Sequence, residues 1–93
     1  MGTILDRMDG DLRLRGLSEV TREEYLRRVR HFSAFYDVAP DQLTADDVRR
    51  YMLHLTDTLR IGPANRKTTI AAIKFLYNVT LDRPEVVARI RFP

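Results

Sequence analysis

The sequence predicts an all-α fold, a compact bundle of four to five helices. Apolar residues recur at helical spacing in four successive stretches, and no stretch alternates between apolar and polar residues as a half-buried strand would. Hydrophobic residues make up 44% and charged residues 31% of the chain, which is typical of a globular protein rather than a disordered one. A chain of 93 residues has the length of one domain, so we expect residues 1–93 to share a single core.

Composition also excludes several classes of protein. The chain has no cysteine, which rules out disulfides and thiolate metal sites. No apolar run approaches the ~18 residues that a membrane-spanning helix needs. Acidic residues near the N-terminus interrupt the apolar segment that a signal peptide requires. We therefore expect a cytoplasmic protein without a membrane partner.

The first expected helix covers residues 3–15. Ile4, Met8 and Leu12 are spaced i, i+4 and i+8, which places them on one face of a helix. Gly10 lies inside this segment and costs about 1 kcal/mol of helix stability relative to alanine.

A tight corner is expected directly after this helix. Gly16 is the residue best able to adopt the positive φ that a helix end often requires. As the C′ residue it would bring Leu17 into apolar contact with Leu12, the contact that accompanies a Schellman motif. Ser18 suits the N-cap of the next helix, because its hydroxyl can accept from an N–H two or three residues on.

The second expected helix covers residues 19–36. Its apolar stripe recurs at i, i+4, i+7 and i+11 and consists of Tyr25, Val29, Phe32 and Tyr36. Four arginines accompany this stripe, but at 100° per residue they do not form a single row. Arg27 and Arg30 face away from the stripe. Arg22 and Arg28 border it on opposite sides.

Two interpretations of these arginines stay open. Glu23 and Glu24 lie four residues before Arg27 and Arg28. Ion pairs between residues i and i+4 on a solvated helix surface would therefore explain the arginines. Contact with a polyanion would explain them equally well.

The third expected helix covers residues 43–59 and is interpreted as structural. Thr44 and Asp47 have the spacing of a capping box, and the acid lies at the end where the helix dipole favours it. Gly62 and Pro63 then end this helix and start the next. The apolar stripe of the third helix consists of Val48, Tyr51, Met52, Leu55 and Leu59.

The fourth expected helix covers residues 64–80 and has two different faces. The face expected to be buried carries Ile70, Ile73, Leu76 and Tyr77. The opposite face carries Lys67, Ala71, Lys74 and Asn78, with Thr68 beside them. This second face suits a DNA major groove, because lysine reaches phosphates or guanine, asparagine can read adenine and alanine permits close approach. An ordinary solvated face is the alternative.

The C-terminal residues are expected to form a short helix and then an extended segment. Asp82 is the candidate N-cap of a helix that begins at Pro84. The apolar side of this helix would consist of Val86, Val87 and Ile90. Residues 89–93 would then leave the bundle in extended form. Phe75, near the polar face of the fourth helix, is expected to pack under this C-terminal segment or to meet a partner domain.

The charged residues indicate an anionic partner. Of the 16 basic residues, fourteen are arginine, which suits bidentate contact with phosphate better than lysine does. Residues 37–58 contain five acidic and two basic residues, whereas residues 59–80 contain four basic residues and no acidic one. A chain with one acidic and one basic side is typical of a protein that binds a polyanion.

The residues do not predict an enzyme. His31 and His54 fit no metal-ligand pattern and are expected at solvated or edge positions. The four glycines are isolated, so no phosphate-binding loop is present, and no Ser/His/Asp arrangement stands out. We expect no catalytic residue, no metal ligand and no cofactor.

Three blocks of the sequence together resemble a known family. The first block is residues 12–18, continued by Thr21, Tyr25, Val29 and Phe32. The second is residues 44–48, continued by Tyr51, Leu55 and Leu59. The third is residues 65–67, continued by Ile70, Ile73, Phe75, Leu76 and Tyr77. In order and spacing these blocks are similar to the N-terminal core-binding domain of tyrosine recombinases, the phage integrase family.

The resemblance implies a SAM-like helical bundle that forms half of a clamp around double-stranded DNA. In this family the second and fourth helices face the DNA, and a catalytic domain with a tyrosine nucleophile follows a linker. The chain would therefore bind a recombination site without cutting it. The implied partners are duplex DNA, the catalytic domain of the same parent chain and other recombinase protomers, in a bacterial cytoplasm.

The predicted DNA-binding residues come from the second helix, the fourth helix and the loop before it. At the start of the second helix, free N–H groups and the helix dipole favour a phosphate. The full set is Ser18, Thr21, Arg22, Arg27, Arg30, Arg60, Arg66, Lys67, Thr68, Ala71, Lys74 and Asn78. The alternative function is a helical protein-interaction module that uses the basic face or the edge around Phe75.

Overall fold

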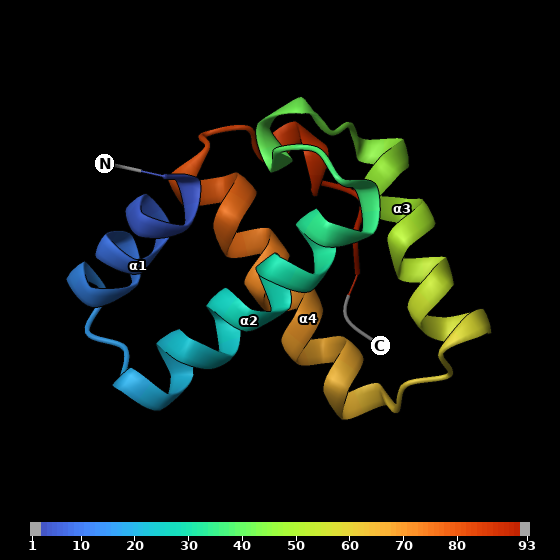
Figure 1. Ribbon diagram of the computed structural model, residues 1–93, viewed down its shortest axis with the longest axis horizontal. Helices are drawn as coiled ribbons and strands as arrows, with labels where there is room; N and C mark the ends of the chain where they lie inside the picture. Colours follow the sequence, from blue (N-terminus) through green and yellow to red (C-terminus); the bar gives the residue numbers. More distant parts are fainter. Residues whose placement is uncertain (1–2, 92–93) are drawn as a thin grey trace.

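A computed structural model describes residues 3–91 and confirms the all-α prediction (Figure 1). Its main helices are α1 (Ile4–Leu14), α2 (Glu19–Tyr36), α3 (Ala45–Leu53) and α4 (Pro63–Phe75). Helix α3 continues into a π-helical turn at His54–Thr58, and α4 into another at Leu76–Thr80. Single 3₁₀ turns lie at Pro40–Gln42 and Pro84–Val86. Residues 3–91 contain no strand.

The two longest helices form the centre of the bundle. Helices α2 and α4 cross there and share the most extensive contact between elements (Figure 1). Helix α1 lies on one side, against α2 and the turn Leu76–Thr80, and α3 lies on the other. The turn Pro84–Val86 packs against α3 and against Leu76–Thr80, so the C-terminal residues close the bundle. The radius of gyration is 12.4 Å.

All four helices contribute to one buried cluster, as the apolar stripes predicted. Phe32 lies at its centre with no exposed surface. The Phe32 ring meets the rings of Tyr51 and Tyr77 edge to face, at centroid distances of 5.0 and 6.3 Å. Edge-to-face geometry is the arrangement that aromatic quadrupoles favour. The cluster includes Met8, Leu12, Leu26, Val29, Val48, Leu55, Ala72, Ile73 and Leu76.

The corner between α1 and α2 has the predicted Schellman geometry. Gly16 has a φ of +76°. The Gly16 N–H donates to Arg13 O at 2.9 Å, and the Leu17 N–H donates to Leu12 O at 3.3 Å. Ser18 caps α2, accepting from the Thr21 N–H at 3.3 Å. This corner sets the direction in which α2 leaves α1.

The predicted capping box at the start of α3 is confirmed. The Asp47 N–H donates to Thr44 Oγ1 at 3.4 Å, and the Thr44 N–H donates to Asp47 Oδ2 at 2.9 Å. Two of the N–H groups that a helix start leaves free are satisfied in this way.

The predicted stripe of the third helix is wrong at its last member. Leu59 is 56% exposed, although Leu55 is buried. The turn His54–Thr58 is wound more widely than an α-helix, since the Leu59 N–H donates to His54 O, five residues back, at 3.0 Å. A π-helical turn contains an extra residue, which rotates the following positions off a stripe of period 3.6.

The C-terminal prediction also needs a correction. Asp82 caps nothing; it has a φ of +51°, and Arg83 occupies the N-cap position of a single 3₁₀ turn. The segment is held instead by Arg83, whose guanidinium donates to Asp41 O at 2.8 Å and to Leu43 O at 3.2 Å. Val86 and Val87 are buried as predicted. The end of the expected extended segment, residues 92–93, lies outside the described residues.

Candidate nucleic-acid interface

The structure places the predicted DNA-binding residues on two neighbouring helices and one loop. The first group, at α2, consists of Ser18, Thr21, Arg22, Arg27 and Arg30. The second group, at α4 and its flanks, consists of Arg60, Arg66, Lys67, Thr68, Ala71, Lys74 and Asn78. Both helices begin at the lower edge of the molecule in Figure 1. The fold therefore brings the starts of α2 and α4 to the same side.

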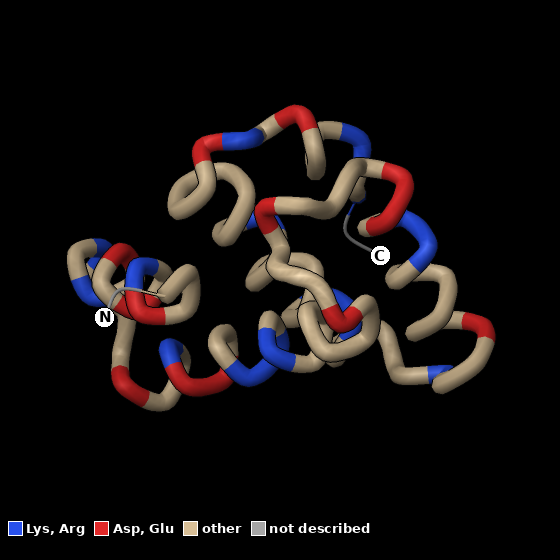
Figure 2. Tube along the Cα trace, turned by 45° about the horizontal axis from the view of Figure 1, so that its top comes forward, with Lys and Arg blue, Asp and Glu red and all other residues tan. Residues whose placement is uncertain are grey.

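In the first half of α2, Arg22 and Arg27 are already bound by other groups of the protein. Arg22 donates through Nε to Asp9 Oδ1 at 3.2 Å and through Nη1 to Leu17 O at 3.2 Å. Arg27 pairs with Glu24, Nη2 to Oε2, at 2.6 Å. Figure 2 shows the result, with basic and acidic positions interspersed along α2. The surface of this helix is therefore partly neutralised.

The ion pairs of α2 agree only in part with the ion-pair interpretation of its arginines. That interpretation paired Glu23 with Arg27 and Glu24 with Arg28, but Glu24 binds both arginines, and Arg28 Nη2 lies 2.6 Å from Glu24 Oε1. Hydrogen bonds from Arg27 and then from Arg28 hold the pKa of the Glu24 carboxyl below its usual value. A single carboxylate at spacings of three and four residues can serve both guanidinium groups.

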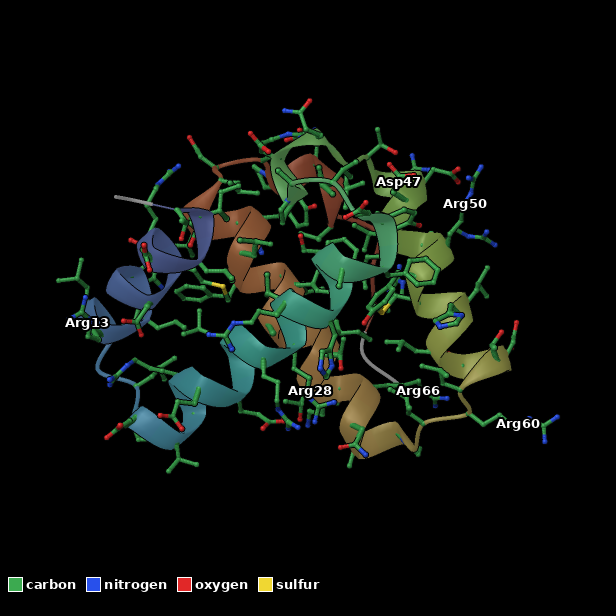
Figure 3. The ribbon with its side chains drawn as sticks, viewed as in Figure 1. Arg13, Arg28, Asp47, Arg50, Arg60 and Arg66 are labelled. Carbon is green, nitrogen blue, oxygen red and sulfur yellow. The ribbon has the colours of Figure 1, made fainter. Side chains whose placement is uncertain are left out.

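Arg28 also joins α2 to the first two turns of α4 (Figure 3). Its Nη1 donates to Thr69 Oγ1 at 3.3 Å, and its Nη2 donates to Asn65 Oδ1 at 3.2 Å. Asn65 was not among the predicted site residues. Its position immediately before Arg66 and Lys67 in an acid-free helix start was the available signal.

Several predicted cations have no acidic partner. Within residues 3–91, Arg30, Arg60, Arg66 and Lys67 make no ion pair and donate no hydrogen bond. Arg60 extends away from the body of the protein (Figure 3), and its backbone has a φ of +52°. Because no carboxylate neutralises these side chains, their charges are available to an anion.

The predicted outer face of α4 has two exposed and two half-buried members. Lys67 and Asn78 are exposed, and Ala71 and Lys74 are half-buried. On the inner side, Thr69, Ile70, Ala72 and Ile73 are buried. Thr68 is half-buried, and its hydroxyl donates to Ala64 O at 3.2 Å. No acidic residue occurs between residues 59 and 80.

Arg66 points to a different side from Lys67. It lines an open groove of about 930 Å³ between α3, α4 and the C-terminal residues, together with Arg49, Met52, Ile70 and Arg89. In Figure 3 the Arg66 label lies on the α3 side of α4. The predicted α4 cations thus divide between the outer face and this groove.

Phe75 is half-buried against the core. We expected Phe75 to pack under the C-terminal segment or to meet a partner domain; the contact observed comes from the end of α1. The Arg15 guanidinium carbon lies 5.8 Å from the centroid of the Phe75 ring. A cation over an aromatic face is favourable at this distance.

The two histidines lie on α2, next to Arg30, and in the turn that follows α3. His31 is exposed, and the half-buried His54 ring lies 4.6 Å from the Phe35 ring. Among residues 3–91 no group of three or more His, Asp or Glu side chains could hold a metal ion. No helix in that part of the chain is long and apolar enough to span a bilayer.

Comparison with known proteins places this arrangement in a family. Residues 4–85 match the family described as the phage integrase N-terminal SAM-like domain. The chain is 34% identical over 90 residues to a Sinorhizobium fredii protein named "Putative integrase/recombinase y4qK", a match that covers 97% of this chain and 29% of that relative. No solved structure matches the chain. The chain belongs to the family of phage integrase N-terminal SAM-like domains, as the three sequence blocks indicated.

Proposed function

We propose that residues 1–93 form one core-binding domain that binds double-stranded DNA as the N-terminal arm of a site-specific tyrosine recombinase. In this role α2 and α4 clamp the recombination site. The observation that carries the proposal is the outer face of α4. It presents two lysines, a small residue and an amide, and no acid lies anywhere between residues 59 and 80.

Each group on this face has a counterpart on duplex DNA. Lys67 and Lys74 suit the phosphates, and Asn78 can donate to and accept from an adenine edge. Ala71 keeps the helix surface low enough for close approach. The major groove is wide enough to admit an α-helix, and the inner face of α4 is buried, so the outer face is the one available to DNA.

Helix α2 would make the supporting contacts. Ser18 and Thr21 lie at the helix start, where N–H groups and the dipole favour a phosphate. Arg30 and the loop residue Arg60 have no acidic partner in the described chain and can pair with phosphates directly. Arg22 and Arg27 would first have to leave Asp9 and Glu24, so we expect them to contribute less.

The strand-exchange chemistry is assigned to a longer parent protein. The chain spans 29% of the length of its integrase/recombinase relative. We propose that the parent supplies a catalytic domain with the tyrosine nucleophile, and that this domain and other protomers on the same DNA are the protein partners. The chain described here would provide affinity and position, not catalysis.

The test is a DNA titration at two salt concentrations. Fluorescence anisotropy with a labelled 20-base-pair duplex should show weak binding. If three to four phosphates are contacted, affinity falls by roughly 40- to 150-fold between 50 and 200 mM salt. Changing both Lys67→Glu and Lys74→Glu should weaken binding by about tenfold or more and make the salt dependence shallower.

Arg49→Glu is the matched control, because Arg49 is exposed and unpaired within residues 3–91 but lies on α3. It should weaken binding much less than the single change Lys67→Glu, which alters the net charge by the same amount. Equal losses for Arg49→Glu and Lys67→Glu would mean that only net charge matters. The proposal is wrong if the amide resonances of α4 do not shift when DNA is added at low salt. If the folded protein binds acidic polypeptides instead of DNA, the protein-interaction alternative is favoured.

A further inference from the structure

We infer that Arg28 is a positioning residue that holds the Asn65 side-chain amide with its N–H groups outward, as a hydrogen-bond donor to the DNA. This inference rests on the proposed function, because it assigns a further contact to the same surface. It also gives the acidic residue Glu24 a role on a helix expected to face a polyanion.

The geometry begins with the chemistry of the two side chains. Arg28 Nη2 lies 3.2 Å from Asn65 Oδ1. A guanidinium group has only donors, so the amide atom that faces it must be the oxygen. The Asn65 NH₂ group must then point away from Arg28. Asn65 is exposed, and within residues 3–91 no group accepts from this NH₂.

Arg28 holds the main chain of Asn65 as well. Its Nη1 donates to Thr69 Oγ1 at 3.3 Å, and that hydroxyl donates to Asn65 O at 3.0 Å. Thr69 is buried, so this connection is sheltered from solvent. Both the backbone and the side chain of Asn65 are therefore tied to α2, although the two residues are 37 positions apart.

Glu24 fixes Arg28 in turn. Arg28 Nε donates to Glu24 Oε1 at 2.8 Å, and the Arg28 side chain is only 18% exposed. Since its charge is paired and partly sheltered, Arg28 is poorly placed to bind a phosphate itself. Its effect on DNA binding passes through Asn65, whose NH₂ suits a phosphate oxygen or an acceptor on a base edge.

A double-mutant cycle tests this order of action. The affinity for one mixed-sequence duplex at fixed salt is measured for wild type, Asn65→Ala, Arg28→Met and the double variant. We expect each single change to lower affinity by roughly 3- to 10-fold, the range for one hydrogen bond. The double variant should lose no more than either single variant, because residues that act through one contact are not additive.

Two further variants separate geometry from charge. Arg50→Met removes one paired arginine from α3 and should change affinity much less than Arg28→Met. Arg28→Lys keeps the charge but lacks the planar fork that serves three acceptors at once, so it should also lose affinity. Circular dichroism at the binding temperature confirms that each variant is folded. If Arg28→Met is unfolded, Arg28→Lys takes its place in the cycle.

The outcomes distinguish the two proposals. Additive losses would show that Arg28 contacts DNA itself, and equal losses for Arg28→Met and Arg50→Met would leave only a charge effect. Either result overturns this inference while the proposed function stands. If wild type does not bind DNA, both fall together.

Discussion

Replacing glycine by alanine at two positions of the α1 region should have opposite effects on stability. Gly16 has a φ of +76°, in the left-handed region, whereas Gly10 lies inside α1. Gly16→Ala should destabilise the protein because a residue with a Cβ is strained in that region. Gly10→Ala should stabilise it because alanine loses less backbone freedom in a helix.

The structure allows the magnitudes to be assigned to the backbone alone. A Cβ added at Gly16 meets no heavy atom within 4 Å, so no clash is added to the cost of the left-handed region, roughly 1–2 kcal/mol. A Cβ added at Gly10 lies 3.9 Å from Arg13 Nη2, an ordinary contact, so the helix gains about 0.5–1 kcal/mol. At roughly 4–8 °C per kcal/mol for a domain of this size, Tm should fall by about 4–16 °C in the first variant and rise by about 2–8 °C in the second.

The assay is thermal unfolding followed by circular dichroism at 222 nm. Gly16→Asn serves as the control, since asparagine tolerates the left-handed region better than alanine and should cost less. A Gly16→Ala variant as stable as wild type would show that the Schellman corner does not require glycine. Equal losses for alanine and asparagine at position 16 would show that the cost does not come from the left-handed backbone conformation.

Two further predictions concern the buried tyrosines. Tyr77→Phe removes a buried hydrogen bond from the hydroxyl to Pro40 O at 2.7 Å. Pro40 O still accepts from the Leu43 N–H at 3.2 Å, so urea unfolding should show a loss of about 0.5–1.5 kcal/mol, the net value of one hydrogen bond; an unchanged midpoint would contradict the role of this bond. Burial raises the pKa of Tyr36, Tyr51 and Tyr77 above the ordinary value of 10.0. The native state therefore holds these protons more tightly than the unfolded chain does. Their contribution to stability is complete below pH 10 and declines as pH rises through the folded pKa values. Equal urea midpoints at pH 8 and pH 11 would refute this prediction.

The helices and their ends were predictable because the signals that set them are local. Gly16, Ser18 and the pair Thr44 and Asp47 act through hydrogen bonds that span three to five residues, and each has the predicted partner. The prediction failed at the first of the two π-helical turns. The π-helical turn at His54–Thr58 moved Leu59 off its stripe, and nothing in the apolar spacing indicated that extra residue.

The candidate site was predictable in outline but not in its pairing. The acid-free outer face of α4 follows from composition and a period of 3.6, so Lys67 and Asn78 lie where expected. The partners of the α2 arginines depend on which acceptors other elements bring near. Arg22 meets Asp9 of α1, and Arg28 meets Asn65 of α4, contacts across 13 and 37 positions that no helical wheel contains.

The sequence by itself determined the fold class, the helix boundaries near their caps and the family, because each depends on residue types at short, regular spacings. Only the tertiary structure decided which cations remain available to an anion. A guanidinium group pairs with any carboxylate or carbonyl that packing brings within about 3 Å. In the folded protein Arg22 pairs with Asp9, and Arg28 binds Glu24 and Asn65. Lys67 has no acidic partner in the described chain.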